Sequence, residues 1–282
     1  MSPPIAPLDV RELDLDAYRR RIGLDGPLTP TRECLERLIP AHAAAIPFEN
    51  IEVLARRVPR LDVAGLQDKL VRQRRGGYCF EQNTLLRAVL QAVGFEVRPM
   101  EARIRSGVAA DVVTGRTHLA TRVMLDGAPW LVDVGCSTVA PLAPLALASR
   151  AQQAAGSGVY RLVDAGDELL LQTLAADGWA DCYQLMPGAP HPVDSEMGNW
   201  FVATHPKSML GHNLLLGRAI PGGRLRLFNR RLSAYQPQGA APVERELQTR
   251  AEFADVLADG FGLDVAPADL DAVMAAIDKL PA

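Results

Sequence analysis

The residue best placed for covalent chemistry is Cys79, which follows the segment Arg-Arg-Gly-Gly-Tyr. The sequence predicts a helix over residues 78–93, with Gly94 as its C-terminal stop. Unpaired backbone N–H groups and the positive end of the helix dipole would surround the sulfur and favour its thiolate, the nucleophilic form. The residues at 81–83 are polar, whereas an inert cysteine usually sits among apolar neighbours. We therefore predict that Cys79 is a nucleophile.

A nucleophilic cysteine needs a base, and the base needs a group that orients it. His118 begins an alternating apolar run, and the Asp126-Gly127 pair that follows this run is a signal for a two-residue hairpin turn. Counting back from that turn places Ala120 opposite Asp133, so His118 and Asp133 share one face as diagonal neighbours. A carboxylate in an otherwise apolar strand is costly to bury without a partner. The sequence thus predicts a Cys-His-Asp triad.

The remaining cysteines and histidines offer no metal site. The four cysteines form no Cys-x-x-Cys pair, and no two of the five histidines have the spacing of ligands on one helix or strand face. We expect free thiols and no bound metal. The other histidines are predicted to lie on the surface or in loops; they are His42, His191, His205 and His212.

Composition limits the class of protein. The chain has 282 residues, more than one hydrophobic core usually holds, so two or three domains are expected. Hydrophobic residues make up 48% and charged residues 22%, which is typical of a folded protein with a sizeable core. The net charge is −3 with scattered basic residues, so neither a nucleic-acid partner nor a membrane surface is expected. Without a signal peptide or a long apolar segment, we expect a cytoplasmic protein.

The pattern of elements changes along the chain. Helical periodicity dominates up to about residue 94, short alternating runs follow, and helical patterns return near the C-terminus. This order predicts an α+β protein with segregated domains. The expected helices cover residues 16–22, a segment after Thr29, a segment from Asp62 to Arg74, residues 78–93, and segments from Thr249 and Pro267. The expected strands are 96–104, 118–125, 130–134, 158–163, 168–174, 224–228 and 231–235, with a loop over 140–155.

Residues 74–83, Arg-Arg-Gly-Gly-Tyr-Cys-Phe-Glu-Gln-Asn, closely resemble the nucleophile motif of arylamine N-acetyltransferases. Three more segments agree with this family in order and spacing. They are Ile-Pro-Phe-Glu-Asn at 46–50, Arg-Thr-His at 116–118 and Trp-Leu-Val-Asp-Val-Gly at 130–135. The resemblance covers about residues 10–240, and it implies a fold as well as an activity.

The implied fold is α+β around a cysteine-protease-like Cys-His-Asp core. An N-terminal helical bundle (1–94) would carry the nucleophile. A central antiparallel β-barrel (95–205) would carry the histidine and the aspartate. A C-terminal α/β lid (206–282) would begin with the interdomain segment. The resemblance also implies that Arg75 and Glu49 form an ion pair with a structural role.

The implied activity is ping-pong acetyl transfer from acetyl-CoA to an arylamine, arylhydrazine or arylhydroxylamine through a thioester on Cys79. Acetyl-CoA would be a co-substrate, with no permanently bound cofactor. Phe48 would line the acceptor pocket, and Thr117 would lie near both substrates. Ser137 would lie in the donor-binding segment. There the chain departs from the family, because Cys136-Ser137 stands where Phe-Gly is usual.

Three other functions are compatible with these residues. Some relatives with the same triad are amide synthases that release a polyketide as a macrolactam, and the altered segment at Ser137 keeps this alternative open. A Cys-His-Asp hydrolase or a transglutaminase-like enzyme shares the order of the triad, although the papain signature is absent. A binding module that retained the site as a scaffold is the non-enzymatic alternative. The identity of the acyl donor separates these functions.

Overall fold

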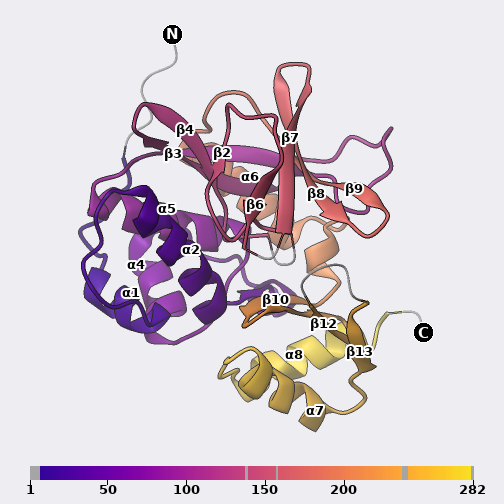
Figure 1. Cartoon of the computed structure of the whole chain (residues 1–282). Coiled ribbons are helices and arrows are strands. Elements are labelled where there is room, and N and C mark those ends of the chain that lie inside the picture. The colour runs from indigo at the N-terminus through magenta and orange to yellow at the C-terminus, as the bar shows by residue number, and fades with distance from the viewer. Residues whose placement is uncertain (1–6, 137–138, 157, 237–240, 281–282) are drawn as a thin grey trace.

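The computed structural model describes residues 7–136, 139–156, 158–236 and 241–280. Helices of the N-terminal third lie against an eight-stranded sheet, and a second sheet with two helices forms the C-terminal part (Figure 1). The helices are α1 (Leu15–Ile22), α2 (Arg32–Ala45), α3 (Ile51–Leu54), α4 (Val63–Leu66), α5 (Cys79–Val93), α6 (Pro192–Thr204), α7 (Arg250–Asp255) and α8 (Pro267–Ile277). This mixed architecture confirms the predicted α+β class.

Capping side chains determine where the N-terminal helices begin. Asp62 starts α4, as predicted, because its carboxylate accepts a hydrogen bond from Gly65 N at 2.9 Å. The predicted start of α2 at Thr29 is wrong. Thr31 is the N-cap, since its hydroxyl accepts from Cys34 N at 3.2 Å. After α4 the chain continues as a π-helix over Gln67–Arg72.

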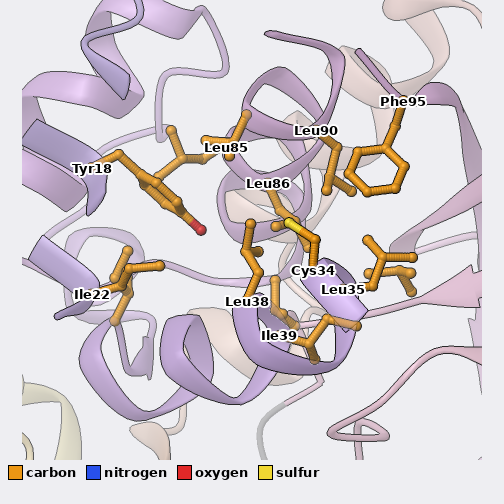
Figure 2. Close-up of a cluster of buried hydrophobic side chains, with 14 of the residues drawn as sticks. Tyr18, Ile22, Cys34, Leu35, Leu38, Ile39, Leu85, Leu86, Leu90 and Phe95 are labelled. Atoms are coloured by element: carbon orange, nitrogen blue, oxygen red, sulfur yellow. The ribbon is translucent and has the colours of Figure 1, made fainter. Parts of the chain in front are cut away.

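The apolar face of α5 is buried in the N-terminal core. Figure 2 shows side chains of α1, α2 and α5 converging there. Removing this much apolar surface from water is the main contribution to the stability of the helical part. The packing of this apolar face also fixes the axis of α5, the helix that begins at Cys79. The labelled side chains are Tyr18, Ile22, Cys34, Leu35, Leu38, Ile39, Leu85, Leu86, Leu90 and Phe95.

The eight-stranded sheet is antiparallel, with strand order β5-β4-β3-β2-β9-β8-β7-β6, and it curves into a nearly closed barrel. Its strands are β2 (Glu96–Ile104), β3 (His118–Leu125), β4 (Ala128–Val132), β5 (Leu145–Ala146), β6 (Gln153–Ala155), β7 (Gly158–Ala165), β8 (Glu168–Ala175) and β9 (Gly178–Leu185). The Gln153 side chain joins the two edge strands: Ala146 N donates to its Oε1 at 2.7 Å, and its Nε2 donates to Ala146 O at 3.2 Å. Both exposed edges are therefore partly satisfied.

The hairpin that orients the predicted triad forms with the predicted register. Leu125 pairs with Ala128 across a two-residue turn. Both turn residues have positive φ, 51° at Asp126 and 73° at Gly127, as a type I′ turn requires. Thr121 pairs with Val132, so the chain after β4 continues toward the start of β3.

The second sheet combines residues from both ends of the chain. Its order is β1-β10-β11-β12-β13, with β1 (Phe48–Glu49), β10 (Leu215–Ile220), β11 (Gly223–Phe228), β12 (Arg231–Tyr235) and β13 (Val243–Glu246). β1 pairs with β10 through Phe48 and Gly217. This pairing brings the Pro-Phe-Glu-Asn segment next to the C-terminal part, a contact between residues far apart in the sequence that no local pattern predicts.

Some predicted elements are wrong or incomplete. Residues 192–204 form α6 inside the segment that was predicted to belong to the β-domain. The predicted loop over 140–155 contains β5 and β6, whose few residues are too short for a periodic signal. The strand predicted at 130–134 begins earlier, at Ala128, because the two-residue turn fixes its start. The domain boundaries at 94/95 and 205/206 remain a prediction. Among the described residues, no helix has both the length and the apolar composition that crossing a membrane requires.

Candidate active site

Cys79 is the first residue of α5, as the sequence predicted for the nucleophile. Its residue is 5% exposed, and its Sγ lies 3.5 Å from the carbonyl oxygen of Thr117, toward which the thiol can donate. Glu81 Oε2 accepts from Tyr78 N at 3.1 Å, which satisfies one N–H at the start of the helix. The sulfur therefore sits at the positive end of the helix, largely shielded from water.

Gly135 allows the aspartate segment to approach the nucleophile. A Cβ at this position would lie 2.6 Å from Cys79 Cα and 2.5 Å from Asn83 Nδ2, both far inside van der Waals contact. Backbone at 135 can therefore pack directly on the start of α5 only because the residue is glycine. The close approach of the two backbone segments therefore explains the glycine in the Asp-Val-Gly motif.

His118 and Asp133 form the buried pair that the hairpin register predicted. Nε2 of His118 lies 2.8 Å from Oδ2 of Asp133, and the two residues are 1% and 0% exposed. The other carboxylate oxygen, Oδ1, accepts from Asn83 Nδ2 at 2.8 Å and from Gly135 N at 2.7 Å. The predicted contact between His118 and Asp133 is confirmed. The catalytic role of this pair stays a prediction.

The two partners hold each other in their charged forms. Burial would raise the pKa of Asp133, but His118, Asn83 and the Gly135 N–H outweigh burial and lower it. Burial would likewise lower the pKa of His118, and the Asp133 carboxylate, with a smaller contribution from Cys79, raises it to about 10. The His118 ring therefore binds a proton strongly, and the Cys79 thiol, which is close enough to contribute to this shift, can supply that proton.

Two residues at the site were not singled out as functional by sequence reasoning. Asn83 lies one helical turn after Cys79, and besides Asp133 it binds Leu119 O at 2.6 Å and accepts from Val134 N at 3.2 Å. Its i+4 spacing from Cys79 was the available signal. Tyr183 lies on β9, a strand that was not predicted, and its ring centroid is 4.7 Å from that of His118.

An ion-pair network supports the segment before Cys79. Arg75 Nη2 lies 2.7 Å from Glu49 Oε1, which confirms the pair that the family resemblance implied. The network extends further than that pair. Asp269 of α8 contacts Arg75 at 3.3 Å, and Lys69 contacts Glu81 at 2.6 Å. The C-terminal helix is thus tied to the nucleophile segment.

The prediction that His42 lies on the surface or in a loop is wrong. It is fully buried, at 0% exposed, between α1 and α5. Tyr18 Oη lies 2.7 Å from Nδ1, and Gln82 Oε1 lies 2.6 Å from Nε2. The Gln82 amide nitrogen donates to three backbone carbonyls, so its oxygen accepts from Nε2–H and Nδ1 accepts from Tyr18. The alanine-rich sequence around His42 did not indicate that Tyr18 and Gln82 bind its ring.

Phe48 and Thr117, the predicted substrate contacts, both lie next to Cys79. Phe48 shares a buried apolar cluster with the nucleophile, and Leu210 and Phe228 border this cluster. Thr117 lines a separate cavity of about 1230 Å³, which Cys79 does not line. Ser137 lies outside the described residues. Within the described ranges, no group of three or more His, Cys, Asp and Glu side chains is arranged to hold a metal ion.

A thiol at a helix start beside a buried imidazole–carboxylate pair defines a cysteine-dependent acyl-transfer or hydrolytic enzyme. Comparison with known proteins narrows this class. The sequence model of an N-acetyltransferase family matches residues 31–270. The arylamine N-acetyltransferase / N-hydroxyarylamine O-acetyltransferase of Salmonella typhimurium is 36% identical, over 95% of this chain and 97% of its own length.

Solved structures agree with the sequence comparison. The arylamine N-acetyltransferase of Mycobacterium marinum in complex with CoA has a TM-score of 0.89 and 36% identity, covering 94% of this chain and 99% of that one. The enzyme of Nocardia farcinica has a TM-score of 0.91 and 34% identity, covering 99% and 100%. The chain belongs to the arylamine N-acetyltransferase family. The predicted family, fold class and enzyme class, an acyltransferase, are confirmed.

Proposed function

We propose that this protein moves an acetyl group from acetyl-CoA to an arylamine, arylhydrazine or arylhydroxylamine, with Cys79 as acyl carrier, His118 as base and Asp133 as orienting carboxylate. The observation that carries the assignment is the buried 2.8 Å bond between His118 and Asp133 beside a thiol at the first position of α5. Membership in the family supplies the substrate class.

The first half-reaction acetylates the cysteine. Because Nε2 of His118 is bonded to Asp133, Nδ1 is the ring nitrogen left to take the proton from Sγ. The thiolate attacks the thioester carbonyl, and backbone N–H groups at the start of α5 can stabilise the oxyanion that forms. The C–S bond to CoA then breaks, and the departing thiolate takes the proton from the imidazolium.

The second half-reaction transfers the acetyl group from Cys79 to the amine. An arylamine is weakly basic and stays a neutral nucleophile at pH 7, so it can attack the acetyl thioester directly. His118 accepts the proton that the nitrogen loses, and the Cys79 thiolate leaves as the amide forms. Asp133 stabilises the imidazolium in both halves without itself taking a proton.

The acceptor pocket in this proposal is the apolar cluster around Phe48. Phe48 shares the buried cluster with Cys79 and Phe228 packs against that cluster, and aromatic neighbours of this kind favour a flat aryl ring over an alkylamine. Leu210 borders the same cluster from the segment after α6. The acceptor amine would reach the thioester from this side.

Thr117 and Ser137 are the proposed contacts of the acyl donor. Thr117 lies next to His118 in sequence, and its carbonyl oxygen lies near the sulfur, so it can adjoin a thioester bound at Cys79. Ser137 is proposed as a second donor contact from its place in the motif. The relative from Mycobacterium marinum was solved with CoA. We further propose that the enzyme works in the cytoplasm on small molecules, without a nucleic-acid or membrane partner.

Mass spectrometry after mixing the protein with acetyl-CoA alone tests the assignment. We expect one acetyl group on the peptide that contains Cys79, and none in the Cys79→Ala variant. Cys136→Ala is the matched control. Cys136 is a half-buried free thiol directly after Gly135, close in sequence to Asp133, and its replacement should leave the adduct on Cys79 intact.

The donor and acceptor identify the reaction. Release of N-acetylarylamine on adding an arylamine supports the proposal. A wild-type protein that stays unmodified by acetyl-CoA, or a Cys79→Ala variant that still makes the amide at the wild-type rate, contradicts it. Turnover only with carrier-tethered acyl chains, or only of peptides, would instead support the amide synthase or the hydrolase.

A further inference from the structure

Arg87 is a partly buried cation without a counterion. It lies on α5, eight residues after Cys79, and its side chain lines the cavity of about 1230 Å³ that Thr117 also lines. Its Nε is buried and has no hydrogen-bond partner, and no carboxylate of the described chain lies within ion-pair distance. Burial alone lowers the pKa of Arg87 to about 10. Such an arrangement costs free energy unless something else supplies the missing charge.

The most deeply buried arginines of this protein are satisfied. Arg21 donates to two backbone carbonyls, Arg105 donates to the carbonyls of the loop that follows it, and Arg224 donates to Ala140 O. Arg75 pairs with Glu49. Four other arginines of the described chain resemble each other in having a buried Nε without a hydrogen-bond partner, namely Arg19, Arg87, Arg122 and Arg226, and of these Arg87 lines the cavity.

The same cavity is also lined by an apolar surface. Helix α6 exposes Val193, Met197 and Trp200, which recur at helical spacing along one face, and all three line the cavity. Trp200 is 61% exposed and Met197 66% exposed, which is high for side chains of this size. Arg116 also lines the cavity but pairs with Glu101, so Arg87 is the lining cation that has no ion pair within the described residues. Apolar surface together with such a cation fits a ligand with an apolar body and an anionic end.

Four acidic residues line the cavity, and three of them already have partners. Glu101 contacts Arg116 at 3.4 Å, and burial raises the pKa of its carboxyl. Asp194 accepts from His191 N at 2.7 Å, and Asp62 binds Arg60 at 2.7 Å. Glu196 lies on the exposed side of α6. None of these carboxylates lies within ion-pair distance of Arg87.

The cavity adjoins the site of acyl transfer. A Cβ at Gly198 of α6 would lie 2.7 Å from the ring of Phe80, the residue after Cys79, so α6 packs directly on the start of α5. Thr117 lies on the shared wall, with its carbonyl oxygen 3.5 Å from Sγ. Eight residues of helix separate Cys79 and Arg87 by roughly 12 Å along the axis. A molecule of moderate length can span that distance.

We propose that this cavity binds an organic anion, a carboxylate or phosphate ester on an apolar body, with Arg87 as the anchor of the anionic group and the exposed face of α6 as the contact for the body. The anion has two conceivable sources, an acceptor amine that carries a carboxylate and the phosphate groups of the acyl donor. Only this choice of source rests on the function proposed above. The binding itself does not depend on it.

Fluorescence of Trp200 gives a direct binding test that needs no turnover. Benzoate is the anionic probe and benzamide its neutral counterpart of the same shape. We expect benzoate to change the tryptophan emission in a saturable way and to bind about tenfold or more tightly than benzamide, as for a hydrogen bond to a charged group. The change should disappear in Trp200→Phe. Equal binding of the two probes, or a benzoate signal that Trp200→Phe retains in full, overturns the proposal.

Variants at Arg87 test the anchor. Arg87→Met should weaken benzoate binding about tenfold and leave benzamide unaffected, whereas Arg87→Lys, which keeps the charge, should retain part of the preference. Arg122→Met is the matched control, since Arg122 Nε is also buried without a partner but does not line this cavity. Benzoate binding that survives Arg87→Met overturns the proposal. If Arg87→Met does not fold, the probe comparison in the wild type and in Arg87→Lys still decides it.

Kinetics with matched substrates identifies the source of the anion. If the acceptor supplies it, Arg87→Met raises KM about tenfold for an arylamine with a ring carboxylate and leaves KM unchanged for its carboxamide counterpart. If the donor supplies it, the variant raises KM for acetyl-CoA and leaves that for acetyl-pantetheine, which lacks the phosphates, unchanged. Either split supports the anion site and identifies the source of the anion, whereas no split overturns both proposed sources, and the benzoate titration decides the site itself. Acetylation of Cys79 is followed separately, so failure of the anion site and failure of the proposed reaction are distinguishable.

Discussion

The triad and the cavity beside it are built on opposite principles. Asp133 uses both carboxylate oxygens, with bonds to His118, Asn83 and the Gly135 N–H, and the whole group is shielded from water. The cavity beside α6 is open, much of its wall is apolar, and one of the two arginines that line it, Arg87, has no carboxylate partner in the described chain. One region is complete without a ligand, and the other is not.

This difference suits the two regions to different tasks: the triad performs the reaction, and the cavity selects the substrate. A preorganised imidazole–carboxylate pair needs no rearrangement when charge develops, so it can serve every substrate alike. A cavity with free apolar surface and an uncompensated charge gains free energy from an occupant and discriminates among occupants by shape and charge. We expect substitutions in the first region to change kcat, and substitutions in the second to change KM.

The largest effect is expected from Asp133→Asn. The amide cannot stabilise the imidazolium or hold its tautomer, so kcat should fall about 10³-fold or more. Steady-state rates with acetyl-CoA and an arylamine measure this. Asp181→Asn is the control, because Asp181 is a carboxylate on another barrel strand, β9, and accepts from Gln172. A loss below about tenfold for Asp133→Asn would mean that the pair is structural.

Asn83→Ala should have the next largest effect. It removes bonds to Asp133, to Leu119 O and from Val134 N inside the core, at a cost of about 2–3 kcal/mol of unfolding free energy and about tenfold to 100-fold in kcat. Urea unfolding and steady-state kinetics measure the two. Gln91→Ala is matched to it, since Gln91 is on the same helix and exchanges two bonds with Leu8 far from the triad. Gln91→Ala should lose stability and keep kcat. Equal kcat losses in both variants would contradict a positioning role for Asn83.

The geometry of the triad was predictable because short-range signals determine it. The Asp126-Gly127 turn fixes the register of β3 and β4, and the alternation of side chains then places His118 on the face of Asp133. The glycine pair before Cys79 and Gly94 after Val93 likewise bound the nucleophile helix locally. These elements needed no knowledge of the rest of the fold.

The supports of the triad were not predictable for the opposite reason. Tyr183 reaches His118 from β9, whose pairing with β2 and β8 is decided by the closure of the barrel. His42 finds Gln82 only once α2 packs on α5. Helix α6 begins at Pro192 in a segment whose inward residues include Ser195 and Asn199, so its sequence lacks the usual apolar inner stripe. Long-range packing determines each of these contacts.

The third prediction concerns the stability of the core below α5. Burial lowers the pKa of His42 to about 4, so the folded protein keeps this imidazole neutral where the unfolded chain protonates it. Between pH 6.5 and about 4 the unfolded state binds more protons, so stability falls as pH falls through this window. The loss from this one group is about 3 kcal/mol at 1.4 kcal/mol per pKa unit.

Urea unfolding at pH 7, 5.5 and 4.5 measures that loss. His42→Gln removes the titrating group and should flatten the pH dependence in this window, although its stability at pH 7 is lower. His212→Gln is the control, because His212 is exposed and should leave the slope of the wild type unchanged. Parallel curves for the wild type and His42→Gln would assign acid sensitivity to other groups.

The smallest effect is expected on the apolar face of α6, where Met197→Ser should change the unfolding free energy by no more than about 0.5 kcal/mol, since the side chain is 66% exposed. kcat should stay within about twofold, because Met197 touches none of the triad. KM for a bulky apolar substrate should rise about threefold, the effect of losing part of one apolar contact. Leu174→Ser is the control, an exposed apolar residue on β8 outside the cavity. A change in kcat without a change in KM would mean that α6 acts on the chemistry, and the division between the two regions would then be wrong.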